Sequence, residues 1–99
     1  MDNVIKYANF IKRLFTTSSP IIRKKLLNSS NNDIIRAISE VLLNVYCKNL
    51  IISKSALKMM KKSKRDLLKV INKRTSYPVR KQLIIRNSEH LLGLSEVFK

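Results

Sequence analysis

Apolar residues recur at intervals of three and four along most of the chain, the spacing of amphipathic helices that share one core. A first helix is predicted near Val4–Phe15, where one side carries Ile5, Ala8, Ile11, Leu14 and Phe15. Ser19 followed by Pro20 predicts a capped second helix that ends near Leu27, because Pro is well tolerated at the first helical position.

The most apolar segment, from Asp33 to about Cys47, predicts the central helix of the core. Its apolar residues cover most of the helix circumference: Ile34, Ile35, Ile38, Val41, Leu42, Val45 and Tyr46. Ser30 and Asp33 have the spacing of a capping box and predict where this helix begins.

Residues 53–72 predict a long helix with one apolar and one basic face, capped by Ser53, with Ser63 as the place for a kink. At about 100° per residue, seven cations fall within about 120° of arc and line about 28 Å of the helix. We call these residues the basic stripe: Lys54, Lys58, Lys61, Lys62, Arg65, Lys69 and Lys73. The opposite arc should face the core and carries Leu57, Met60, Leu67, Leu68 and Ile71.

A turn is predicted at Thr75–Pro78, followed by another helix. This helix should point Val79, Leu83 and Ile84 inward and Arg80, Lys81 and Arg86 outward. Ser88 is a candidate cap for a last turn that contains Leu91, Leu92 and Leu94. With one Gly, two Pro and no strand pattern, the predicted fold is all-α, a compact single-domain bundle of five or six short helices over residues 1–99.

The charge of the chain is strongly positive and unevenly placed. Twenty-one Lys and Arg stand against six acids, a formal net charge of +15, and residues 54–86 hold twelve of these cations but only one acid, Asp66. Like charges on one face repel each other unless a polyanion such as DNA or RNA neutralises them. We therefore predict that residues 53–86 bind nucleic acid through the basic stripe together with Arg74, Arg80 and Lys81.

The composition of the basic stripe argues against base reading. It has six Lys and one Arg, and so lacks the bidentate groups that recognise base edges, which predicts binding without sequence preference. Tyr7 and Tyr46 lie in apolar surroundings and should pack in the core. Tyr77, beside the basic turn, is the one tyrosine that we expect as a candidate for stacking on an unpaired base.

Catalysis and metal binding find no support in the sequence. The six carboxylates are dispersed, and His90 is far from Cys47, so we expect no enzyme, no metal site and no cofactor. Cys47 is the only cysteine and is expected to be a buried thiol. No apolar run approaches the about 20 residues of a membrane span, and charges interrupt any signal-peptide core, which predicts an intracellular protein that is not secreted.

Three other roles fit parts of the pattern. The basic helix and the helix after Pro78 could form a helix-turn-helix, although the turn between them has no glycine. The first helix or the basic helix could lie on an anionic membrane surface. Leu91–Leu94 could be an interface with a second copy of the chain or with a capsid protein, and a homo-oligomer would be compatible with DNA binding.

Four segments of the chain, in this order and spacing, carry a family resemblance. They are SSPIIRKKLL at Ser18–Leu27, DIIRAISEVLLNV at Asp33–Val45, SKSALKMMKKSKRDLLKVI at Ser53–Ile71 and VRKQLII at Val79–Ile85. The chain resembles small basic proteins of Maverick or Polinton-type elements and of adintoviruses, which are likened to adenovirus core proteins.

This resemblance implies a viral, DNA-binding protein of the virion core that condenses the genome inside a capsid, and therefore a place in the virion or the host nucleus. Proteins of that group commonly continue into a Gly-Gly and Leu-rich apolar segment. This chain has the single Gly93 there, so no function of that segment is carried over.

Overall fold

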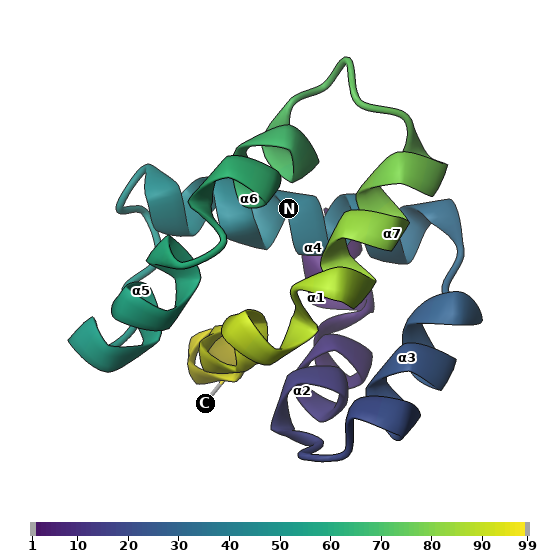
Figure 1. The fold of residues 1–99 in the computed structure, drawn as a ribbon, viewed down its shortest axis with the longest axis horizontal. Helices are drawn as coiled ribbons and strands as arrows, with labels where there is room; N and C mark the ends of the chain where they lie inside the picture. The colour runs from purple at the N-terminus through teal and green to yellow at the C-terminus, as the bar shows by residue number, and fades with distance from the viewer. Residues whose placement is uncertain (1, 99) are drawn as a thin grey trace.

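The computed structural model describes residues 2–98 and consists of helices joined by short connections (Figure 1). In chain order the elements are α1 (Asp2–Lys6), α2 (Ala8–Thr16), α3 (Pro20–Asn28), α4 (Asn32–Tyr46), α5 (Lys54–Lys61), α6 (Lys64–Ile71), α7 (Tyr77–Arg86) and the 3₁₀ helix η1 (Ser88–Phe98). The predicted all-α class is confirmed for the described residues. The predicted number of helices is too low, because two of the predicted helices are each divided in two.

Both divisions fall at a residue with a backbone conformation outside the helical region. Tyr7 (φ −106°, ψ 14°) separates α1 from α2, and Ser63 (φ −115°, ψ 18°) separates α5 from α6. The change of direction at Tyr7 buries Val4 and leaves Ile5 75% exposed, so the predicted inward position of Ile5 is wrong. The predicted kink at Ser63 is confirmed, and there it is a complete break.

Helix starts follow the predicted capping residues in two cases and not in a third. Ser19 caps α3 and Ser53 caps α5, each accepting a hydrogen bond from the backbone N–H three residues on. For α4 the cap is Asn31, whose Oδ1 accepts from the Ile34 N–H at 2.9 Å. The predicted cap, Ser30, instead donates its hydroxyl hydrogen to the carbonyl of Leu26 at 2.8 Å, closing the end of α3.

The core is built around α4, which lies behind α6 and α7 in Figure 1 and also packs against α1. Its buried residues are Ile34, Ile35, Ala37, Ile38, Ser39, Val41, Leu42 and Val45, as expected for the central helix. Cys47 follows the end of α4 and is exposed, so the prediction of a buried thiol is wrong. The chain turns away from the core there, and the next residue, Lys48, has a positive φ of 62°.

The C-terminal 3₁₀ helix η1 lies between α2 and α5 and packs against both. Leu91 and Leu94 are completely buried there. Leu91 and Leu94 are therefore not available for the predicted interface at Leu91–Leu94, because both side chains belong to the core of the same molecule. Val79 also differs from its predicted inward position, since it is 48% exposed, whereas Leu83 and Ile84 are buried as predicted.

Candidate nucleic-acid interface

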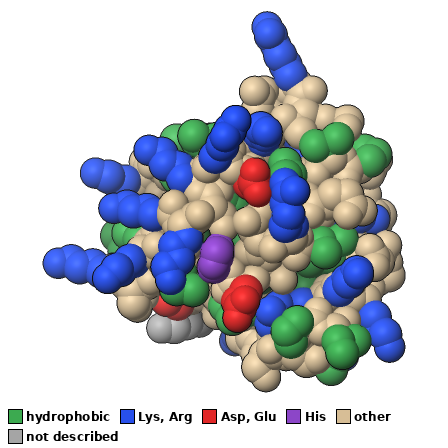
Figure 2. All heavy atoms as spheres, viewed as in Figure 1, with side chains coloured by type: hydrophobic (Ala, Val, Ile, Leu, Met, Phe, Trp, Pro, Cys, Tyr) green, Lys and Arg blue, Asp and Glu red, His purple; other side chains and the backbone are tan. Residues whose placement is uncertain are grey.

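Every residue of the basic stripe is exposed, as is Arg74 in the loop after α6. Figure 2 shows Lys and Arg side chains gathered over α5 at the left edge of the molecule and continuing over α6 toward the loop at the top. The surface is not one straight line, because the break at Ser63 divides it between two helices. The positive face therefore follows the bend between α5 and α6.

The buried side of α5 and α6 is narrower than the sequence pattern predicts. It consists of Ala56, Met60, Ser63, Leu67 and Val70, which repeat at intervals of four and three. Leu57 and Leu68 were expected inside and are 37% and 45% exposed. Lys64, which the helical pattern places on the arc of these two leucines, is exposed and belongs to the positive surface.

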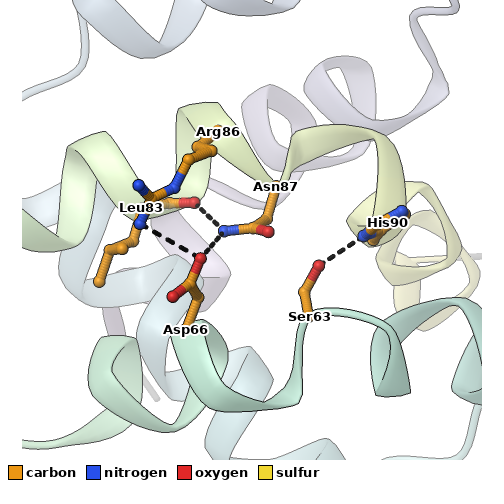
Figure 3. Close-up of polar contacts among 6 residues, drawn as sticks. All are labelled: Ser63, Asp66, Leu83, Arg86, Asn87 and His90. Atoms are coloured by element: carbon orange, nitrogen blue, oxygen red, sulfur yellow. Dashed lines mark hydrogen bonds and ion pairs between the residues drawn. The ribbon is translucent and has the colours of Figure 1, made fainter.

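The single acid within this region is neutralised by partners on the next helix (Figure 3). Asn87 donates a side-chain N–H to Asp66 Oδ2 at 3.0 Å, and the Arg86 guanidinium lies 3.2 Å from the same oxygen. The hydrogen bond from Asn87 lowers the pKa of Asp66, and the charges of Arg86 and Lys69 lower it further. Asp66 thus joins α6 to the end of α7, and its charge is shared with Arg86.

A second polar contact holds the break between the two basic helices. The Ser63 hydroxyl and His90 Nδ1 form a short hydrogen bond, which connects the break to η1 (Figure 3). This contact gives His90 a structural role. The bond fixes the place where α5 and α6 change direction.

The three cations of α7 are all engaged within the molecule. Arg80 is 8% exposed and donates hydrogen bonds to the carbonyls of Thr75 at 2.9 Å and Asn72 at 3.0 Å. The prediction that Arg80 points outward to bind nucleic acid is therefore wrong, because its guanidinium satisfies carbonyls of the loop before α7. Lys81 donates to the Asn28 carbonyl at 3.2 Å, and Arg86 pairs with Asp66.

This engagement also weakens the helix-turn-helix alternative. A recognition helix needs side chains that reach base edges, and α7 uses all of its cations to hold the loop, α3 and α6 in place. Within residues 54–86, the exposed cations outside α7 lie on α5 and α6, at Lys62 between these two helices, and in the loop between α6 and α7.

The tyrosines are placed largely as predicted. Tyr7 and Tyr46 pack against the core, and burial raises the pKa of Tyr46. Tyr77 is half-buried, with the Arg80 guanidinium 5.0 Å from its ring centre. Its hydroxyl accepts a hydrogen bond from Arg36 Nε at 2.8 Å, and this bond raises the pKa of Arg36.

Within residues 2–98, His, Cys, Asp and Glu do not gather in any group of three or more that could hold a metal ion. None of the helices in this part of the chain combines the length and the apolar character needed to cross a bilayer.

Comparison of the chain with protein-family models, with curated proteins and with solved structures found no match. The resemblance to proteins of Maverick or Polinton-type elements and adintoviruses therefore stays a prediction.

Proposed function

We propose that the protein binds nucleic acid, and DNA in particular, without sequence preference, through the basic stripe together with Lys64 and Arg74. The observation that carries this proposal is the concentration of exposed cations on α5, α6 and the following loop, with Asp66 the only acid among them and already paired. The like charges of such a surface repel each other, and binding to DNA is favourable because the cations neutralise phosphates and release the counterions condensed on the DNA.

The arrangement suits phosphates better than bases. Lysine ammonium groups act as point charges on flexible stems, whereas base reading relies on Arg, Asn or Gln held in a fixed geometry in the major groove. Contacts to the backbone position a protein on the duplex and carry no sequence information. Genome condensation in a virion or a host nucleus is the role that combines this surface with the family resemblance.

The dependence of DNA binding on salt tests the proposal. If about five cations contact phosphates, log affinity should fall against log salt concentration with a slope of about −4.5. Two duplexes of unrelated sequence should give the same slope and nearly the same Kd. A shallow slope with one strongly preferred duplex would instead indicate a regulator that reads bases, and duplex RNA as a third ligand measures any preference for DNA.

A membrane surface is the second candidate, because exposed apolar side chains lie among the lysines. Leu57, Met59 and Leu68 are each between 36% and 45% exposed on α5 and α6. Apolar residues beside cations are typical of proteins that lie on anionic lipid. Vesicles with and without anionic lipid, assayed under the same salt conditions as the DNA, separate the two candidates, since tight binding to vesicles alone would contradict the DNA proposal.

A further inference from the structure

A cavity of about 330 Å³ opens between α4, the end of α6 and the start of α7. This volume is at the lower end of the about 300–1,000 Å³ typical of small-molecule sites. Leu43 and Ile71 contribute apolar walls and Tyr77 contributes an aromatic ring. The proposed phosphate contacts on the outer faces of α5 and α6 leave this cavity without a role.

Three cations and one carboxylate line the cavity: the cations are Arg36, Lys73 and Arg80, and the acid is Glu40. The side chains of Arg36 and Lys73 are exposed. Arg36 uses Nε for the hydrogen bond to the Tyr77 hydroxyl, one of the five N–H donors of a guanidinium. Lys73 is also the last residue of the basic stripe, so the cavity adjoins the surface that we propose for the DNA backbone.

The wall that carries Tyr77 is held in place by Arg80, which also lines the cavity. Arg80 binds the carbonyls of Thr75 and Asn72 and lies 5.0 Å from the centre of the Tyr77 ring. The loop between α6 and α7 is thereby closed around a buried guanidinium. A wall fixed in this way loses little conformational entropy when a ligand binds.

We propose that this cavity binds one unpaired nucleotide of the nucleic acid that lies along the basic stripe. A base has flat apolar faces that match Leu43, Ile71 and the Tyr77 ring, and its phosphate matches Arg36 and Lys73. Stacking on an aromatic ring tolerates any base, in keeping with binding that has no sequence preference. The inference rests on the proposed function and adds to it a preference for strand ends or gaps over intact duplex.

Three DNA ligands test this preference on the full chain. They share one duplex and differ at one end, which is blunt, carries an overhang of three thymidines, or carries an overhang of three abasic nucleotides. The thymidine overhang should bind about fivefold to tenfold tighter than either of the others. The abasic overhang adds the same phosphates, so the comparison isolates the base.

The outcomes separate the two proposals. Equal Kd values for the thymidine and abasic overhangs, with salt-dependent binding of the blunt duplex, would overturn the cavity proposal and leave the proposed function standing. Absence of binding to all three ligands would overturn both.

Variants locate the effect in the cavity. Tyr77→Leu should abolish the preference for the thymidine overhang and leave the Kd for the blunt duplex unchanged, and Tyr77→Phe should retain the preference because it keeps the ring. Ser39→Leu is an independent test, because Ser39 lines the cavity and its hydroxyl bonds only back to the Ile35 carbonyl of its own helix at 2.9 Å. Its added side chain should fill the cavity and remove the preference. An unchanged preference in folded Ser39→Leu would overturn the proposal.

Discussion

Helix α4 and the pair α5–α6 have nearly the same number of residues, but they bury very different shares of them. Eight of the fifteen residues of α4 are buried, whereas α5 and α6 bury two of eight each and expose most of their cations. The difference predicts that folding depends mainly on α4 and that the proposed binding depends on α5 and α6. Substitutions in α4 should change stability, and substitutions on the outer side of α5 and α6 should change only the affinity for nucleic acid.

The largest expected effect tests the first half of this comparison. Ile38→Ala and Leu42→Ala should each lower the free energy of unfolding by about 2–5 kcal/mol, because both side chains are completely buried and truncation leaves a cavity. Urea unfolding followed by circular dichroism measures the change. Leu43→Ala is the matched control on the same helix, since Leu43 is 39% exposed and should cost much less. Equal costs at Leu42 and Leu43 would mean that the core lies elsewhere.

The second half of the comparison is tested by reversing charges at the bend. Lys58→Glu with Lys62→Glu and Arg65→Glu should weaken DNA binding by about 100-fold or more at moderate salt, since we propose that these exposed cations contact phosphates. The helical circular-dichroism signal should stay unchanged. The matched control reverses Lys12, Lys24 and Lys25, which are exposed on α2 and α3 and change the net charge equally. Equal losses in the two triple variants would indicate that only the total charge matters.

Two arginines, Arg74 in the loop after α6 and Arg80 in α7, sharpen the comparison further. Arg80→Ala should lower the free energy of unfolding by about 1.5–3 kcal/mol, because two loop carbonyls lose a charged hydrogen-bond donor, and should leave the salt dependence of DNA binding unchanged. Arg74→Ala should do the reverse, lowering affinity without affecting stability, since Arg74 is exposed. Chemical unfolding and a salt titration of each variant distinguish the two roles.

The sequence predicted the helices well wherever local signals agreed with the packing. Ser19 with Pro20, and the apolar run after Asp33, led to the observed starts of α3 and to the central helix α4. The prediction of buried positions failed where a residue's surroundings depend on elements that are distant in the sequence. Leu57 and Leu68 look like core residues, but α4 and η1 cover only the narrow side formed by Ala56, Met60, Leu67 and Val70, and exposed leucines are common in folded proteins.

The candidate site shows the same limit. The basic stripe was predicted from its spacing alone and all seven residues are exposed, although their binding to nucleic acid stays a prediction. The prediction that Arg80 points outward was wrong, because its guanidinium donates to carbonyls of a loop whose path no local pattern specifies. The cavity beside Tyr77 was not foreseen, since α4 and the loop that form it are about thirty residues apart in the sequence.

A smaller effect is expected where η1 meets α5. A Cβ added to Gly93 would overlap Cβ of Ala56 and lie 3.2 Å from its Cα, so Gly93→Ala should cost about 1–3 kcal/mol of stability. Ala56→Gly in the same chain should restore part of the loss by removing the overlapping atom. A double-mutant cycle measured by urea unfolding gives the coupling between the two positions. Additive costs would show that Gly93 is needed for some reason other than this close approach.

The smallest expected effect concerns the one acid of the basic region and its dependence on pH. The pKa of Asp66 is lowered in the folded protein, first by the hydrogen bond from Asn87 and then by Arg86, so its ionised form stabilises the fold. That contribution is complete above the ordinary pKa of 3.8 and is lost as the pH falls through the lower folded value. Asp66→Asn should therefore lower the urea midpoint near neutral pH, and its difference from the wild type should shrink as the pH falls from about 4 to about 2. Comparing the two proteins cancels the titration of the other carboxylates, which both proteins share.

Asn87→Ala should reduce the pH dependence of stability more than Arg86→Met does, because Asn87 has the larger effect on the pKa of Asp66. A difference in stability between wild type and Asp66→Asn that stays constant with pH would show that Asp66 does not connect α6 to α7 through its charge.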